Sequence, residues 1–343
     1  MEKITIIRPD DWHIHLRDDC RLNLAVEHVS RYFGRALVMP NLIPPLTTYH
    51  LAKSYYSRIQ SNCSSLTFSP FLTLYLTDNT SIQDVKDVAM SDFILAFKLY
   101  PKKVTTNSEA GVSSLENLYP IFSEMQKLGV VLCLHGEQSG EDIDPFDREK
   151  YFIDKELRQL VEHFPDLKIV FEHITTQEAC DFISATQTNI AATITPQHLM
   201  FNRSDLLSGG VKPHLYCLPI LKRSHHQEAL ISAATSGKPQ FFLGTDSAPH
   251  IQSDKESSCG CAGCYSGHAS LEMYVQVFEQ QGALSKLEGF ASIYGSQFYG
   301  LTKNEDKITL VKKSWEVPDF YEVNEERIVP LLAGQCLQWQ VLS

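Results

Sequence analysis

Two histidines one residue apart, His13 and His15, lie in the first strand-like run of the chain, ITIIRPDDWHIHLRD. Residues i and i+2 of an extended strand share a face, so both imidazoles are expected to point at one site. Paired imidazole nitrogens are suitable ligands for a zinc ion. The alternative is that one histidine packs in the core and the other lies at the surface. The pair therefore needs further ligands before it indicates a metal site.

Further candidate ligands lie at or near the ends of later apolar segments. They are Lys98 in FILAFKLY, His135 at the end of VVLCLH, His173 at the end of KIVFEH and Asp246 at the end of FFLGTD. Each has a structural alternative, such as a hydrogen-bonded core histidine or an aspartate that caps a helix. Together with the histidine pair they predict an open, catalytic metal site, for which His and Asp ligands are typical.

Lys98 is unusual because it lies inside an apolar segment, and a buried ammonium group is costly. Its neutral amine could form a Schiff base, pair with a carboxylate, or react with CO₂ to give a carbamate. A carbamate offers two carboxylate-like oxygens that can bridge two cations. Beside four histidines and an aspartate, we favour the carbamate.

The elements that must position these residues alternate along the chain. Apolar, β-branched segments predict strands at 4–7, 35–40, 67–75, 93–100, 130–135, 168–173, 189–195 and 241–246. Amphipathic segments between them, including 114–129, 154–165 and 224–237, predict helices. This alternation is typical of an α/β fold of the (β/α)8 TIM barrel type, in which all carboxyl ends of the strands meet at one face. A doubly wound open sheet would need a Gly-rich turn after the first strand, which the sequence lacks.

Composition limits the remaining possibilities. Residues 1–343 are expected to form a single barrel domain, with about 303–343 as a C-terminal extension packed on the barrel. The net charge of −11 argues against a nucleic-acid binder, and no apolar run reaches the roughly 18 residues of a membrane span. The N-terminal residues lack the pattern of a signal peptide, so a cytoplasmic location is expected.

Nine cysteines in such a chain are expected to be reduced thiols. Cys259, Cys261 and Cys264 in CGCAGC have the spacing of a metal knuckle but lack a clear fourth ligand nearby. A tight glycine-containing loop is therefore favoured over a structural metal site at this position.

The order of the strand-end residues resembles the amidohydrolase superfamily with binuclear zinc centres. The motifs RPDDWHIHLRD, MPNLIPPLTT, FKLYP, LHGE, FEHITT, ATITPQHL, GTDSAPH and KESSCGCAGC are similar to those of the monofunctional bacterial-type dihydroorotases. The similarity runs from about residue 5 to QFYGL at 297–301. It implies a homodimeric enzyme that reversibly cyclises N-carbamoyl-L-aspartate to L-dihydroorotate in pyrimidine biosynthesis.

The resemblance also implies a metal centre with two zinc ions per subunit. Its implied ligands are His13, His15 and Asp246 for the more buried ion, and His135 and His173 for the other. Lys98, carboxylated on its Nζ atom, and a hydroxide would bridge the two ions. Asp246 would accept a proton from that hydroxide and pass it to the departing ring nitrogen.

The substrate contacts are likewise implied by the resemblance. Arg17, Asn41 and His250 would bind the substrate carboxylate, backbone groups of Leu218 and Ala262 would meet the pyrimidine ring, and Thr105 and Thr106 would lie on a loop that closes over it. Arg17 follows His15 by two residues, so it keeps the same side if the extended backbone continues. Its alternative is a surface ion pair with Asp18 or Asp19, and the alternative for Asn41 is a role in a turn.

Two other functions compete with this prediction. A hydantoinase or allantoinase would share the metal centre, but its neutral substrate ring would not need Arg17 and Asn41 as carboxylate ligands. A non-catalytic relative that serves as an assembly scaffold would be expected to have lost ligands, and this sequence keeps all six.

Overall fold

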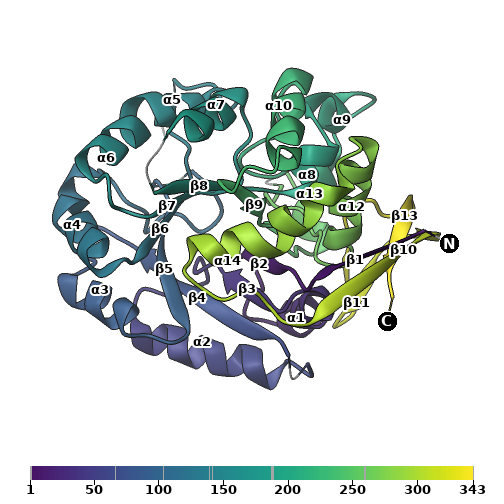
Figure 1. The fold of residues 1–343 in the computed structure, drawn as a ribbon, viewed down its shortest axis with the longest axis horizontal. Helices are drawn as coiled ribbons and strands as arrows, with labels where there is room; N and C mark the ends of the chain where they lie inside the picture. The colour runs from purple at the N-terminus through teal and green to yellow at the C-terminus, as the bar shows by residue number, and fades with distance from the viewer. Residues whose placement is uncertain are drawn as a thin grey trace.

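The computed structural model describes residues 2–65, 67–102, 104–138, 140, 142–186, 189–258 and 260–342. Within this part of the chain, eight parallel strands pair in sequence order from β2 to β9 and are surrounded by helices (Figure 1). The strands are β2 (Asp10–Ile14), β3 (Arg35–Val38), β4 (Ser69–Leu76), β5 (Ile94–Leu99), β6 (Val131–Leu134), β7 (Ile169–Phe171), β8 (Ile190–Ile194) and β9 (Phe241–Leu243). The predicted (β/α)8 barrel is confirmed.

The barrel closes between β2 and the residues that follow β9. The amide of Asp246 donates to the carbonyl oxygen of His13 at 2.8 Å, and the amide of His15 donates to the carbonyl oxygen of Ser247 at 3.0 Å. These bonds place the carboxyl ends of the first and last barrel strands side by side. They also bring Asp246 beside the two histidines.

The prediction that residues 4–7 form the first strand of the barrel is wrong. Those residues do form strand β1 (Lys3–Ile7), but β1 pairs antiparallel with β10 (Lys307–Glu316) in a separate sheet of order β1–β10–β13. The first barrel strand is instead β2, which the sequence places directly before the second histidine. The polar start of β2, Asp10 and Asp11, hides this strand from an analysis based on apolar runs.

The helices lie mainly on the outside of the barrel (Figure 1). They are α1 (Arg21–Tyr32), α2 (Tyr49–Ser61), α3 (Ile82–Ala89), α4 (Tyr119–Leu128), α5 (Arg148–Phe152), α6 (Arg158–His163), α7 (Gln177–Ala185), α8 (Pro196–Met200), α9 (Arg203–Leu207), α10 (Ser224–Thr235), α11 (Gln252–Lys255), α12 (Ser270–Gln280), α13 (Leu284–Glu288) and α14 (Tyr294–Phe298). Short 3-10 turns span Glu116–Leu118 and Pro213–Leu215, and π turns span Ile153–Leu157 and Gly289–Ile293.

The helices predicted from the sequence are found with shifted ends. The segment 114–129 contains α4, which ends at Gly129 in the left-handed conformation (φ 69°) that glycine adopts without strain. The segment 154–165 contains a π turn and α6, and 224–237 contains α10. Within the described residues, no helix has the length and apolar character needed to span a membrane.

The amino ends of the barrel strands are filled by apolar side chains. Trp12 of β2 stacks on Tyr299 with ring centroids 4.5 Å apart, and both belong to a cluster that includes Phe242 and Phe298. Lys168, just before β7, donates to the carbonyl oxygen of Phe298, which fixes the end of α14 at this side. Polar chemistry is therefore left to the opposite, carboxyl end of the barrel.

The segment predicted as a C-terminal extension, about 303–343, forms strands rather than irregular chain. Besides β10 it contains β11 (Tyr321–Val323), β12 (Glu326–Ile328) and β13 (Cys336–Val341). Trp339 of β13 is fully buried and donates through its indole nitrogen to Glu279 of α12. This bond ties the small sheet to a helix of the barrel.

Candidate metal centre and substrate pocket

His13, His15 and Asp246 form a buried cluster at the carboxyl ends of β2 and β9. The Nε2 atoms of His13 and His15 lie 3.3 and 3.0 Å from the same Asp246 carboxylate oxygen. One ligand atom from each residue lies within 4.8 Å of the others, as binding of one metal ion requires. Within the described residues, no other cluster of at least three His, Cys, Asp or Glu side chains has this geometry.

Two of the candidate ligands have unusual backbone conformations. Asp246 has φ 49° and His173 has φ 41°, in the left-handed region that non-glycine residues seldom adopt. Each is held by a hydrogen bond from its amide, to the carbonyl of His13 for Asp246 and to the hydroxyl of Thr193 for His173. Such strain, fixed by the surrounding structure, is typical of functional sites.

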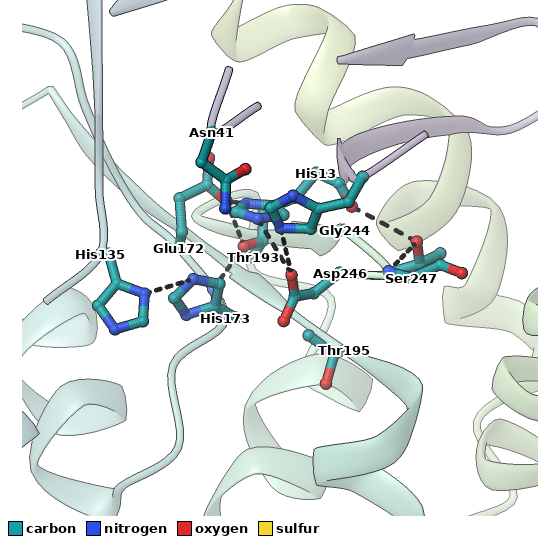
Figure 2. A network of polar contacts seen from close by, with 12 residues as sticks. His13, Asn41, His135, Glu172, His173, Thr193, Thr195, Gly244, Asp246 and Ser247 are labelled. Atoms are coloured by element: carbon teal, nitrogen blue, oxygen red, sulfur yellow. Dashed lines mark hydrogen bonds and ion pairs between the residues drawn. The ribbon is translucent and has the colours of Figure 1, made fainter. Parts of the chain in front are cut away.

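His135 and His173 form a second pair beside this cluster (Figure 2). The Nδ1 atom of His135 lies 3.2 Å from the Nε2 atom of His173, and the ring of His173 also contacts that of His13 with centroids 4.9 Å apart. On its other side, Nε2 of His135 lies 2.8 Å from a carboxylate oxygen of Glu137. With its proton on Nε2, His135 presents the lone pair of Nδ1 to the centre.

Glu172 lies behind the first cluster. One of its carboxylate oxygens is 2.9 Å from Nδ1 of His13 and accepts a hydrogen bond from the Thr193 hydroxyl at 2.6 Å. The same hydroxyl accepts a hydrogen bond from the amide of His173. Glu172 and Thr193 therefore link a candidate ligand of the first cluster to a candidate ligand of the second, as Figure 2 shows.

Lys98, on β5, is completely buried. Among the described residues its Nζ atom has no hydrogen-bond partner, and it lies 5.2 Å from the centre of the Tyr100 ring. Burial lowers the pKa of the Lys98 ammonium, although the charges of Glu172 and Asp246 act in the opposite direction. The neutral amine that reacts with CO₂ is therefore more accessible than at a surface lysine.

Burial also sets the charge of the histidines. It lowers the pKa of His15 to about 4 and holds those of His135 and His173 below their usual range. Burial acts to raise the pKa of Asp246, but its contacts with His13 and His15 and the charge of His13 outweigh burial and hold that pKa well below its usual range. His13 is the exception: burial acts to lower its pKa, but the charge of Glu172 and contacts with Asp246 outweigh burial and raise it. An ionised carboxylate and neutral imidazoles are the states that bind a metal cation, so a metal ion would compete with a proton at His13.

These residues fit a centre for divalent metal ions. Nitrogen and oxygen atoms of four imidazoles and a carboxylate converge, and the Lys98 amine is unpartnered among the described residues. Glu137 and Glu172 contact the outer nitrogens of two of the imidazoles, as carboxylates commonly do behind metal-binding histidines. The donor types suit zinc.

A pocket opens over this cluster, with about 360 Å³ of empty space when the open solvent at its mouth is included. Most of the predicted site residues line it: His13, His15, Arg17, Asn41, Thr105, Thr106, His135, His173, Leu218, Asp246 and Ala262, with Tyr100, Ala248 and Gly263 in addition. Lys98 and His250 are not part of the lining, because Lys98 is buried below the surface and His250 packs against Arg17.

Arg17 and His250 form a buried pair at the edge of the pocket. The Nη2 atom of Arg17 lies 2.8 Å from Nε2 of His250, and only 8% of Arg17 is exposed. The expectation that Arg17 continues the extended strand is wrong, because it has φ 63°. The alternative, a surface ion pair of Arg17, is not found: Asp18 pairs with Arg58, and Asp19 pairs with Arg21. The guanidinium of Arg17 thus lines the pocket without a carboxylate partner among these surface pairs, held by His250 and by the carbonyl oxygen of Pro249.

The segment around Thr105 and Thr106 contacts two other residues of the pocket lining, Asn41 and Ala262. Asn41 donates to the carbonyl oxygen of Thr106 at 3.2 Å, and Asn107 donates to the carbonyl oxygen of Asn41 at 3.0 Å. The Thr106 hydroxyl donates to the carbonyl oxygen of Ala262 at 3.5 Å. These bonds place the segment over the pocket.

Three residues of the site have no role in the sequence analysis. Glu172 directly precedes His173 in FEH, and Glu137 follows His135 by two residues in LHGE. The motifs therefore contain both, but only the structure shows their contacts. Tyr100 lines the pocket, and its buried hydroxyl has no partner among the described residues. Burial raises its pKa well above the usual value, so it remains a neutral hydrogen-bond donor.

The cysteine-rich loop lies beside the site. Cys264 is buried in an apolar cluster that also contains Cys217, while Cys261 is partly exposed. Cys259 lies outside the described residues. In the described part of the loop, no cysteine joins a cluster with metal-binding geometry.

Comparison with known proteins identifies the family to which this fold and site belong. A model of the amidohydrolase family matches residues 5–313. The parallel barrel and the His-His-Asp cluster at its carboxyl end occur within that match. The chain therefore belongs to the amidohydrolase family, as its motifs predict.

Within this family the chain groups with the dihydroorotases. It is 54% identical to a dihydroorotase of Shewanella denitrificans over 344 aligned positions, covering 100% of both chains. The crystal structure of a dihydroorotase from Campylobacter jejuni matches 100% of this chain and 98% of its own, with a TM-score of 0.92 and 37% identity. A dihydroorotase from Saccharomyces cerevisiae in complex with 5-fluoroorotic acid matches 100% of this chain and 99% of its own, with a TM-score of 0.91 and 33% identity.

Proposed function

We propose that this protein is a dihydroorotase, which reversibly cyclises N-carbamoyl-L-aspartate to L-dihydroorotate and water in pyrimidine biosynthesis. The observation that carries the proposal is one pocket that joins a buried His-His-Asp cluster to a buried arginine. The first suits amide hydrolysis, and the second suits a substrate with a carboxylate. High identity to dihydroorotases along the whole chain supports the same reaction.

We propose that His13, His15 and Asp246 hold one zinc ion and that His135 and His173 hold a second. Carboxylated Lys98 and a hydroxide would be shared between them. The spacing of the two histidine groups and the burial of the lysine support this arrangement. Zinc ions bound there would activate a water molecule and polarise the amide carbonyl.

In this proposal Asp246 moves the proton. In the hydrolytic direction its carboxylate accepts a proton from the attacking water and delivers it to the ring nitrogen as the carbon–nitrogen bond breaks. The low pKa of Asp246 keeps the acceptor form available at neutral pH. The backbone bond to His13 fixes the carboxylate at the floor of the pocket.

Arg17, Asn41 and His250 are proposed to bind the substrate carboxylate. Arg17 offers a planar set of N–H donors that matches two carboxylate oxygens. Burial and the charge of Arg21 lower the pKa of Arg17 to about 10, so it stays charged at neutral pH. Asn41 lines the same pocket, and His250 steadies the guanidinium.

The ring of the substrate is proposed to lie against the backbone of Leu218 and Ala262. Thr105 and Thr106 would close over it, and the bond from Thr106 to Ala262 shows that the two segments already meet. This closure would exclude water from the pocket.

A substrate panel tests the proposed function. Purified protein should hydrolyse dihydroorotate and act poorly on dihydrouracil and hydantoin, which lack the carboxylate that Arg17 would bind. A hydantoinase would show the reverse preference, and an allantoinase would instead hydrolyse allantoin, which completes the panel. A protein with no activity on any cyclic amide would instead be a non-catalytic assembly scaffold.

We further propose that the enzyme is a cytoplasmic homodimer with residues 1–343 as one domain. The dimer follows from the family resemblance, and the absence of a membrane-spanning helix in the described residues is compatible with the location. Sedimentation velocity of the purified protein would measure the mass in solution, and a monomer would contradict the proposal.

A further inference from the structure

A buried lysine outside the metal centre holds the wall of the pocket together. Lys255 ends helix α11 and is only 4% exposed. Its ammonium donates to three backbone carbonyl oxygens, those of Tyr216 at 2.8 Å, Cys261 at 2.7 Å and Gly263 at 2.8 Å. Hydrogen bonds from a charged donor at these distances are among the strongest in proteins.

The three carbonyls belong to two segments that are far apart in sequence. Tyr216 lies two residues before Leu218, while Cys261 and Gly263 flank Ala262. Leu218, Ala262 and Gly263 all line the pocket. The amide of Gly263 also donates to the carbonyl oxygen of Tyr216 at 2.9 Å, so Lys255 reinforces a junction between the two segments.

This junction contacts the other substrate-binding groups. Gly263 has φ 142°, and a Cβ atom at this position would lie 2.9 Å from Nε2 of His250, which contacts Arg17. On the other side, Thr106 donates to the carbonyl of Ala262. A shift of the junction would therefore disturb both the proposed carboxylate site and the closing segment.

The charge of the Lys255 ammonium is directed at backbone carbonyl groups. In the described part of the chain its charge is met by the three carbonyl dipoles of Tyr216, Cys261 and Gly263. Burial lowers its pKa, and the nearby thiols of Cys264, Cys217 and Cys261 act against this shift. A buried ammonium is costly unless it is fully hydrogen-bonded, and Lys255 uses three donors on three acceptors.

We infer that Lys255 is a positioning residue for substrate binding: it fixes the backbone of Leu218 and Ala262 as the surface that receives the substrate ring. The identity of that ring rests on the proposed function, whereas the junction itself does not. Lys255 touches neither the metal-ligand cluster nor Asp246 in any hydrogen bond of the described structure. Its loss should therefore weaken binding more than chemistry.

The test compares Lys255→Met with Lys222→Met. Lys222 is equally buried at 4% exposure, but its ammonium donates to one carbonyl oxygen, that of Ile220, and it does not line the pocket. We expect Lys255→Met to raise KM for dihydroorotate about tenfold or more with kcat within about threefold, the pattern of lost uniform binding. Lys222→Met should leave KM near that of the parent protein.

Amide hydrogen exchange supplies a readout that needs no substrate. In Lys255→Met, peptides covering 214–219 and 260–265 should exchange faster than in the parent, while peptides from the barrel strands should not change. Metal content should equal that of the parent. Where Lys255→Met does not fold, Lys255→Gln, which keeps one donor group, gives the same comparison.

If neither peptide of Lys255→Met exchanges faster than in the parent, Lys255 does not reinforce the junction. Faster exchange with an unchanged KM would overturn the positioning role and leave Lys255 a structural residue. A parent protein inactive on dihydroorotate would contradict the proposed function alone. The KM comparison would then use whichever cyclic amide the parent hydrolyses.

Discussion

The Nδ1 atom of His13 lies 2.9 Å from a carboxylate oxygen of Glu172, and both side chains are almost completely buried. A carboxylate in this position keeps the imidazole proton on Nδ1, so the lone pair of Nε2 faces His15 and Asp246. Glu137 does the opposite for His135, because it contacts Nε2 and leaves Nδ1 to face the centre. Two buried carboxylates thus select which nitrogen of each imidazole is available to a metal ion.

Glu172→Gln and Glu137→Gln should each lower zinc affinity by about 10- to 100-fold, because an amide holds the imidazole tautomer less firmly than a carboxylate. Competition with a chelator of known affinity would measure the change. Glu272→Gln is the matched control, since Glu272 is also a fully buried carboxylate but lies on α12, outside the metal-ligand cluster. Parent-like zinc affinity in both variants would contradict the tautomer argument.

Asp246→Asn should reduce kcat by about 10²- to 10⁴-fold, because the amide keeps the shape of the side chain but cannot accept the proton. Binding of the substrate should change little, since the proposed carboxylate and ring contacts lie on other residues. Steady-state kinetics in excess zinc, with calorimetry of ligand binding, would separate the two effects. Retained turnover would remove Asp246 from the proton path.

Arg17→Ala should raise KM for dihydroorotate about tenfold to a hundredfold, the range expected for a lost charge-assisted contact. Weak hydrolysis of dihydrouracil, which has no carboxylate, should be unaffected. Arg21→Ala is the control, because Arg21 pairs with Asp19 and does not line the pocket. Equal losses on both substrates would mean that Arg17 does not bind the carboxylate.

Glu272 gives a prediction for stability against pH. Burial raises its pKa from 4.5 to about 7, so the folded protein binds a proton that the unfolded chain has released between these values. The contribution of Glu272 to the free energy of unfolding is therefore largest below pH 4.5 and falls as the pH rises through 7. The full loss is about 3 kcal/mol.

Glu272→Gln removes this titration, because the amide is neutral at every pH. Its free energy of unfolding relative to the parent should therefore increase from pH 4 to pH 8 by about 3 kcal/mol. Urea unfolding at several pH values would measure it, with the exposed Glu305→Gln as control. A constant difference between Glu272→Gln and the parent would mean that the pKa of Glu272 is the same in the folded and the unfolded protein.

The site was more predictable from the sequence than parts of the fold. The candidate ligands end apolar strand-like segments, and a barrel brings those ends together, so His135, His173 and Asp246 could be grouped without coordinates. The partner of β1 could not be predicted, because the pairing of Lys3 with Val311 joins residues some three hundred positions apart. A strand pattern predicts the strand but not its neighbour.

Backbone geometry and contacts between distant residues were the other features that the sequence did not predict. The left-handed conformation of Arg17 breaks the i, i+2 rule, and its position in the pocket comes from its contact with His250. The roles of Glu172 and Lys255 depend on distances to residues brought close by the fold, and neither residue type is unusual in its own segment.

The proposed zinc-dependent hydrolysis is tested by titrating metal-free protein with zinc and following the ultraviolet absorbance of dihydroorotate. We expect no hydrolysis without metal and an activity that rises until two zinc ions are bound per chain. Full activity of the metal-free protein, or metal-loaded protein that does not hydrolyse dihydroorotate, would contradict the proposal.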